Sequence, residues 1–205
     1  MTPAIDAAFA AGLEITALHN HFFYDKPKVY FMHIGGMGQP EELAKAVKSV
    51  WDAIKKVRAE NPKPAVGFAG EVPKEGKIDQ AVIEKVLGYQ AQTQDGVVKV
   101  TIGWQGTMHG VHVGGSIGLA TWAAFSGSDE WAAVDGDFIM TAAEVQPVLR
   151  ALRAADIHIV ALHNHMIGEQ PAFYFVHFWG KGPVEQLARG IRAALDAQRQ
   201  PGSAR

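Results

Sequence analysis

Residues 159–182 read IVALHNHMIGEQPAFYFVHFWGKG, and residues 15–38 read ITALHNHFFYDKPKVYFMHIGGMG. The two stretches align without a gap at an offset of 144 positions, the difference between His163 and His19 (163 − 19). Both carry the motif HNH, then a proline, then an aromatic run that contains a third histidine. A solenoid repeats roughly every 20 to 50 residues, so an offset this long instead indicates two copies of one larger structural unit.

The second copy is complete enough for its elements to be predicted. A helix is expected over 141–156, because Thr141 and Glu144 form a T-x-x-E capping box ahead of an amphipathic pattern. Residues 157–163 and 172–180 are β-branched and aromatic runs separated by a short bend, which predicts neighbouring antiparallel strands. After the second strand, apolar residues recur at helical spacing. Each copy is therefore expected to end in strand, strand and helix.

The stretch between the copies differs in composition. Residues 61–77 are rich in proline, glycine and lysine and are predicted to be a linker. A short helix capped by Gly88 follows, and successive strands are predicted over 96–104, 111–115, 117–125 and 131–140. The sequence thus predicts an α+β fold, a tandem duplication of antiparallel strands packed against helices. Residues 1–60 are the C-terminal part of an incomplete first repeat, and residues 78–200 are the complete second repeat.

The composition is that of a folded globular protein and excludes several partners. Of the 205 residues, 48% are hydrophobic and 20% are charged. A formal net charge of -2 gives no electrostatic reason to expect nucleic acid or an anionic membrane as a partner. Because the chain has no cysteine, any metal must be bound by nitrogen and oxygen ligands. No stretch reaches the roughly 18 apolar residues of a membrane helix, and the amino terminus lacks the pattern of an export signal.

Several longer motifs resemble those of a known family. The HNH bend, YFVHFWG, ATWAAF, GDFIMTAAEVQPVLRALR and LARGIRAALD are similar to the LppY/LpqO family of bacterial lipoproteins, over nearly the whole chain. Members of that family look like tandem duplications of an uncharacterised domain and are often exported, so the resemblance implies kinship but no activity. From the residues given, which contain no cysteine and do not begin with the pattern of an export signal, we expect neither export nor lipid attachment to be encoded here, and the localisation stays open. The first repeat is either shortened or completed otherwise, for example by another subunit of a homo-oligomer.

The histidines are the candidate functional residues. Alternate side chains of an extended segment share a face, so each H-x-H pair presents two imidazoles together, and a third follows on the neighbouring strand. Three imidazoles are suitable ligands for zinc or copper. A carboxylate stands four residues beyond each pair, and a glycine-rich segment, MHGVHVGG, carries a further candidate. The expected metal ligands are His19, His21, Asp25 and His33 in the first copy, His163, His165, Glu169 and His177 in the second, and His109.

The geometry of the bend leaves alternatives open. If the bend is centred near residues 23 and 24, His33 lies more than about 10 Å from His19, so that each triad is not one site. A site would then combine His19 and His21 with groups from elsewhere, including groups across the interface of the two repeats. In a separate alternative, the histidines brace hairpins in a non-catalytic binding or assembly module. A metal with an open coordination position would instead favour a metal-dependent hydrolase, although the sequence shows no general base or substrate pocket. Four carboxylates are expected in turns and on a solvated face: Asp129, Glu130, Asp135 and Asp137.

Overall fold

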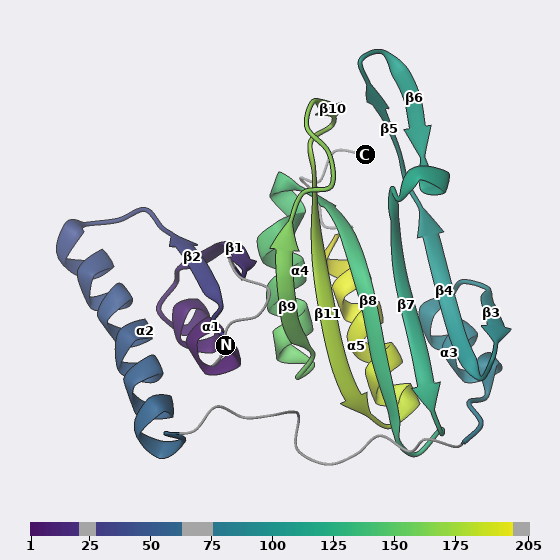
Figure 1. Cartoon of the computed structure of the whole chain (residues 1–205), viewed down its shortest axis with the longest axis horizontal. Helices are drawn as coiled ribbons and strands as arrows, with labels where there is room; N and C mark the ends of the chain where they lie inside the picture. Colours follow the sequence, from purple (N-terminus) through teal and green to yellow (C-terminus); the bar gives the residue numbers. More distant parts are fainter. Residues whose placement is uncertain (21–27, 63–75, 199–205) are drawn as a thin grey trace. The chain divides into compact units, whose positions relative to one another are not determined.

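The computed structural model describes residues 1–20, 28–62 and 76–198. The chain forms two compact units, Met1–Glu71 and Val72–Arg205, and each is described by itself (Figure 1). Their boundary falls inside the stretch 61–77 that was predicted to be a linker, most of which lies outside the described residues. Helices and antiparallel strands make up both units, so the predicted α+β class is confirmed.

The first unit contains two helices and one pair of strands in its described part. Its elements are α1 (Thr2–Ala10), β1 (Glu14–His19), β2 (Phe31–Gly35) and α2 (Pro40–Glu60). The strands pair antiparallel, with a bulge between Ile15 and Ala17, and α1 contacts both β1 and α2. Ile5 and Ala8 on α1 and Ile15 and Leu18 on β1 are fully buried. The buried residues therefore come from one stripe of the helix and one face of the strand.

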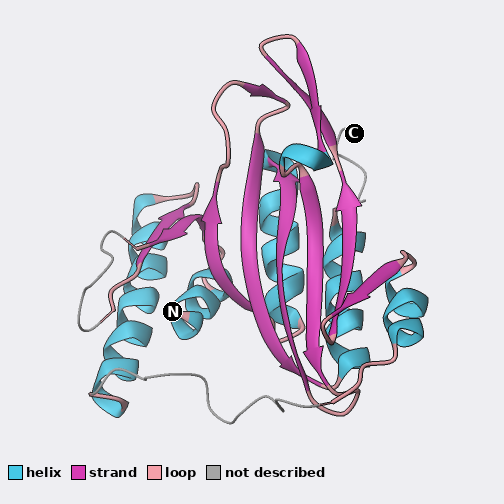
Figure 2. Ribbon diagram, turned by 45° about the vertical axis from the view of Figure 1, so that its right-hand side comes forward, coloured by secondary structure: helices cyan, strands magenta, loops and turns pink. Residues whose placement is uncertain are grey.

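The second unit is built on a six-stranded antiparallel sheet. Its elements are α3 (Gln80–Leu87), β3 (Ala91–Gln94), β4 (Val97–Gly103), β5 (Gln105–Met108), β6 (Val111–Gly114), η1 (Gly115–Ile117), β7 (Ala120–Gly127), β8 (Ala132–Thr141), α4 (Ala142–Ala154), β9 (His158–His163), β10 (Glu169–Gln170), β11 (Phe173–Gly182) and α5 (Val184–Ala197). The strands of the sheet lie in the order β9-β11-β8-β7-β4-β3, and β10, β5 and β6 form a smaller sheet that extends beyond one end of it (Figure 2). Helices α4 and α5 contact each other and the central strands β8 and β11, and α3 packs on α5.

Strand alternation decides which side chains of β8 and β11 are available for a site. Phe138 and Phe178 lie in contact on one face of the sheet, with ring centroids 5.5 Å apart. Gly136 lies opposite Phe178, and a Cβ at Gly136 would stand 2.2 Å from the Phe178 ring. The glycine therefore makes room for this ring. Because successive side chains of a strand point to opposite faces, the neighbouring Asp137 points to the other face, together with His177.

Local predictions about helix ends are confirmed. Glu144 Oε2 accepts the backbone N–H of Thr141 at 2.7 Å, which completes the predicted capping box of α4. Gly88 ends α3 in the left-handed conformation, with φ at 74°.

β3 and β5 were not predicted, because AQTQ and QGTM lack an apolar alternation. No helix among residues 1–20, 28–62 and 76–198 is long and apolar enough to span a membrane.

The first unit and the end of the second unit share the order helix, strand, strand, helix, apart from the short β10, and their elements lie at the predicted offset. β1 and β9 differ by 144 positions at both ends, since they run from Glu14 to His19 and from His158 to His163. α2 and α5 begin at positions that differ by the same number, because α2 begins at residue 40 and α5 at residue 184. These boundaries agree with a repeat, and an origin by duplication stays a prediction.

Candidate functional site

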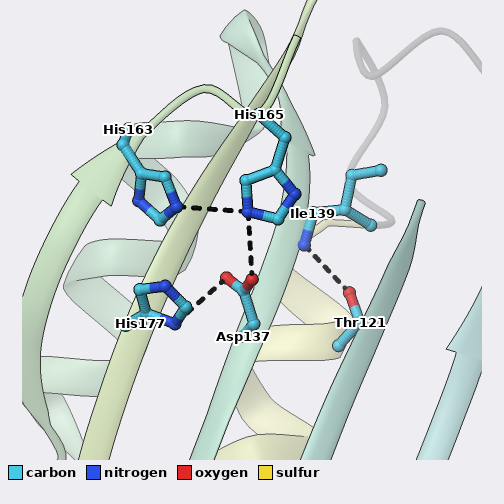
Figure 3. Close-up of polar contacts among 6 residues, drawn as sticks. All are labelled: Thr121, Asp137, Ile139, His163, His165 and His177. Atoms are coloured by element: carbon cyan, nitrogen blue, oxygen red, sulfur yellow. Dashed lines mark hydrogen bonds and ion pairs between the residues drawn. The ribbon is translucent and has the colours of Figure 1, made fainter. Parts of the chain in front are cut away.

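Three histidines and one aspartate meet at the end of β9 on the face of the sheet that carries Asp137 (Figure 3). His177 on β11 lies directly opposite Asp137 on β8. His163, the last residue of β9, pairs with Phe175, so it stands diagonally to His177 on the same face. His165 follows two residues later, in the bend after β9. We call these four residues, His163, His165, His177 and Asp137, the His/Asp cluster.

The distances within the His/Asp cluster are short. The Nε2 atoms of His163 and His165 are 3.1 Å apart. His165 Nε2 lies 3.6 Å from Asp137 Oδ2, and His177 Nδ1 lies 3.8 Å from Asp137 Oδ1. The rings of His163 and His177 stack with their centroids 4.7 Å apart. Each imidazole of the cluster therefore contacts another imidazole, the carboxylate, or both.

The surroundings hold His165 in place although it lies outside the strand. Its ring stacks flat on Phe175, with centroids 3.5 Å apart and planes 7° from parallel. Phe175 itself is fully buried in an apolar cluster with Leu119, Ile139 and Phe173. In the bend, Asn164 Nδ2 donates to the carbonyl oxygen of Met166 at 2.8 Å. The bend therefore has a defined shape.

The carboxylate of the cluster is deeply placed. Asp137 is 3% exposed, and it lies at the end of the ladder between β7 and β8, opposite Trp122. Beyond that pair, the backbone N–H of Ile139 on β8 donates to a side chain of β7 and not to its backbone: the acceptor is Thr121 Oγ1, at 3.2 Å (Figure 3). This contact fixes the part of β8 that carries the aspartate.

Burial shifts the protonation of the cluster toward neutral groups. It raises the pKa of Asp137 to about 6; His177 opposes this rise and Asp135 adds to it. Burial lowers the pKa of His163 to about 4, with the positive charge of protonated His177 and His165 adding to the effect. The pKa of His165 is lowered as well, again mainly by burial and then by His177. At neutral pH, His163 and His165 are therefore uncharged and have a nitrogen lone pair to offer.

Two buried polar atoms of the cluster lack a hydrogen-bond partner within the described ranges. They are Asp137 Oδ1 and His163 Nδ1. A buried acceptor or donor without a partner costs about 1–3 kcal/mol, so such atoms normally bind a proton, a water molecule or an ion. Both lie in the His/Asp cluster, which marks it as a place where a ligand would be stabilised.

The first unit contains a smaller version of this arrangement. His19 Nε2 and His33 Nε2 are 3.0 Å apart, and their rings stack with centroids separated by 5.1 Å. The expected separation of more than about 10 Å was therefore wrong. The register pairs His19 with Phe31 rather than with residue 28, which brings His33 into the diagonal position beside it. His21 and Asp25, the other expected ligands of this copy, lie outside the described residues.

Two expected ligands of the second unit lie elsewhere. Glu169 is in β10, is 6% exposed, and accepts the N–H of Phe173 on its Oε1 at 3.0 Å. His109 is in the turn between β5 and β6 with φ at 50°, close to Gly168. Over the part of the chain that the structure describes, neither residue makes a hydrogen bond or ion pair with the three imidazoles. Glu169 serves the backbone of the bend instead.

Asp137 is the residue of the cluster whose position was predicted incorrectly from the sequence. It was expected in a turn or on a solvated face with Asp135, yet it is buried within a strand. The signal was its position in DGDFIM, where a carboxylate directly precedes an apolar run at strand spacing. A carboxylate at such a position is seldom buried without a partner.

The described side chains do not form a complete metal site as they stand. Among residues 1–20, 28–62 and 76–198, no group of three or more His, Cys, Asp or Glu residues is arranged to hold a metal ion. The two nitrogens of His163 and His165 are close enough to share an ion, whereas His177 contacts Asp137 through the other oxygen. A site with three or four ligands would therefore need a rotation of the His177 ring or the Asp137 carboxylate.

Comparison with known proteins identifies a family but no activity. No curated protein and no solved structure matches the chain. A family model described as a Domain of Unknown Function (DUF1259) matches residues 1–53 and 81–197, which is most of the chain. The first matched range contains His19 and His33, and the second contains the whole His/Asp cluster. The chain belongs to this family of unknown function.

Proposed function

We propose that this protein binds a divalent transition metal, zinc or copper, through His163, His165 and His177, with Asp137 as a fourth ligand or as a partner that orients His177. The observation that carries the proposal is the 3.1 Å separation of the His163 and His165 Nε2 atoms. Zinc binds imidazole nitrogen at about 2.0–2.1 Å, so two such ligands of a tetrahedral ion lie about 3.3 Å from each other. The two nitrogens already stand close to that separation.

The electrostatics of the cluster support the same proposal. A metal binds the neutral form of imidazole, and the lowered pKa values of His163 and His165 keep both rings neutral at pH 7. The Asp137 carboxylate is buried and has one oxygen without a hydrogen-bond partner among the described residues. A nearby cation would offset the cost of ionising it. The cluster thus joins neutral nitrogen donors to a buried negative charge.

The first unit supports the proposal independently. Its His19 and His33 Nε2 atoms are 3.0 Å apart, again near the separation of two ligands of one ion. His21 and Asp25 are the natural additional ligands of this second, smaller site. We also propose that the chain is related to the LppY/LpqO family, on the basis of the motifs that they share.

Metal analysis of protein purified without an affinity tag tests the proposal. We expect zinc or copper at close to one ion or more per chain. His163→Gln should lose the ion of the second unit, and Asp137→Asn should weaken its binding by about 10- to 100-fold, as removal of an orienting carboxylate does. The matched control is His158→Gln on the same strand, whose ring contacts Trp179 and not the cluster. Equal metal content in all four proteins would refute the assignment.

A second candidate function is a binding or assembly module in which the histidines only brace the bend. The contact that favours it is Asn164 Nδ2 to the Met166 carbonyl, because this is a hydrogen bond that shapes the bend without any metal. Two neutral imidazoles at 3.1 Å can also share one proton as donor and acceptor. This function predicts no bound metal in the analysis above and a loss of stability in His163→Gln that added zinc does not change.

A metal-dependent hydrolase is the third candidate and follows from the first. His165 lies at the surface, so a metal held there has a solvent-facing position at which it can bind water. Such an ion lowers the pKa of bound water. Turnover of a simple ester by the metal-loaded protein, lost in His163→Gln, would distinguish a hydrolase from a protein that only binds the ion.

A further inference from the structure

A cavity of about 640 Å³ lies in the second unit, outside the His/Asp cluster. It is bounded by the link between α3 and β3, the start of β5, the junction of β8 with α4, and the end of α5. This volume is in the range of known small-molecule sites, which run from about 300 to 1,000 Å³. The residues that decide its chemistry are Tyr89, Trp104, Gln105, Thr141, Glu144 and Phe173.

Aromatic rings form part of the cavity wall. Trp104 and Phe173 meet edge to face, with centroids 6.1 Å apart and planes at 76°. Phe173 is 1% exposed and is packed in the apolar cluster with Leu119 and Ile139, so its position is fixed. Tyr89 also lines the cavity. Rings at such angles present both their π faces and their edges to the cavity. This part of the wall therefore suits an apolar or a cationic group.

A buried carboxylate borders the same cavity. Glu144 is 3% exposed, and its Oε2 accepts both the N–H and the Oγ1–H of Thr141, at 2.7 and 2.9 Å. Its second oxygen, Oε1, takes part in neither contact. None of the residues described as lining the cavity is lysine, arginine or histidine. Among its described lining residues, the cavity therefore joins a negative group to aromatic rings without a basic side chain.

We propose that this cavity binds a small organic cation, an amine joined to an apolar body. The ammonium group would donate to Glu144 Oε1, and the apolar body would lie against Trp104 and Phe173. A charged hydrogen bond to a buried carboxylate is stronger than one between neutral groups, and a cation is also attracted to the aromatic faces. An anion would be repelled by the same carboxylate. The proposal does not rest on metal binding, because no residue of the His/Asp cluster lines this cavity.

Three monosubstituted benzenes of nearly equal size test the proposal on the full chain at pH 7.5. Benzylamine is cationic, benzyl alcohol is neutral and benzoate is anionic. Binding is followed by shifts of the backbone amide signals and of the Trp104 indole N–H signal in two-dimensional NMR. One series has the His/Asp cluster saturated with zinc, and in the other the metal is removed by a chelator. We expect benzylamine to bind with a dissociation constant on the order of 1 mM, as suits a ligand of so few atoms. Benzyl alcohol should bind at least about tenfold more weakly, and benzoate should not bind.

Glu144→Gln is the decisive variant, because glutamine also completes a capping box and keeps α4 folded while it removes the charge. We expect it to weaken benzylamine about tenfold and to leave benzyl alcohol unchanged. The matched control is Glu185→Gln, in the first turn of the neighbouring helix α5. Equal binding of benzylamine and benzyl alcohol, or equal benzylamine binding by the two variants, would overturn the proposal. Either of these results in the chelated series would overturn only the cavity proposal, because the His/Asp cluster then holds no metal. The metal-binding proposal is tested separately by metal analysis.

Discussion

Replacement of Asp137 by asparagine should change how the stability of the apo protein depends on pH. In the unfolded chain this carboxyl has its ordinary pKa of 3.8, and in the folded protein its pKa is about 6. Between these values the folded state holds a proton that the unfolded state has lost, so the contribution of Asp137 to stability falls as the pH rises from about 4 to 6. Asparagine does not titrate, and the variant should not show this fall.

The size of the effect follows from the shift. Each pKa unit corresponds to about 1.4 kcal/mol, and a shift from 3.8 to about 6 therefore gives about 3 kcal/mol between pH 4 and pH 7. His163 acts in the opposite direction, because its pKa falls from 6.5 to about 4, and its contribution to stability rises with pH over the same range. In the wild type this rise, to which the lowered pKa of His165 adds, offsets part of the fall due to Asp137. In Asp137→Asn the rise due to His163 remains, at no more than about 1.4 kcal/mol per pH unit, and less because His163 is partly exposed.

Urea unfolding at pH 4.5, 5.5, 6.5 and 7.5 with a metal chelator present measures the difference. Tryptophan fluorescence reports mainly the second unit, which contains four of the five tryptophans, Trp104, Trp122, Trp131 and Trp179. The free energy of unfolding of Asp137→Asn relative to wild type should increase with pH. Asp95→Asn, in the exposed turn between β3 and β4, is the control and should follow the wild type. Parallel pH curves for Asp137→Asn and wild type would refute the account of the buried carboxylate.

Three further predictions concern packing, capping and metal binding. Gly136→Ala should lower the free energy of unfolding by about 2 kcal/mol or more, because the added Cβ would meet both Phe178 and the Trp122 carbonyl. Gly103→Ala, with open space around it, is the control and should be close to neutral in the same urea assay. Glu144→Ala should cost about 1 kcal/mol of stability through loss of the capping contact, and Glu144→Gln should cost much less; equal losses would show that the capping box contributes nothing. Zinc at 100 times its dissociation constant should stabilise the wild type by about 2.7 kcal/mol in a thermal melt, and a matching gain in His163→Gln would contradict the assignment of the His/Asp cluster.

The features that the sequence predicted well are those set by neighbouring residues. The capping box of α4 needs only Thr141 and Glu144, and the left-handed end of α3 needs only Gly88. The strand-strand-helix order followed from two runs of apolar residues and the spacing after them. Interactions of this kind lie within one turn or one strand, so the residues that decide them are visible side by side.

The features that the sequence did not predict depend on pairing between distant segments. The contact of His19 with His33 depends on the register of β1 and β2. A shift of three positions from the expected register brings the two rings from separate positions into contact. The place of Asp137 beside His177 depends on the pairing of β8 with β11, a contact across 40 positions (177 − 137). Glu169 was expected to reach the imidazoles, but β10 pairs with β5 and turns its carboxylate to the Phe173 amide. None of these choices is encoded by local spacing.

X-ray absorption spectroscopy at the zinc edge, on untagged protein loaded with one equivalent of zinc, shows directly which atoms bind the metal. Metal binding by the His/Asp cluster should give at least two imidazole nitrogens at about 2.0–2.1 Å, with the outer-shell signals of histidine rings. These signals should be lost in the double variant that replaces His163 and His165 by glutamine. A shell made of oxygen atoms alone, or a spectrum that is the same in wild type and double variant, would contradict metal binding by this cluster.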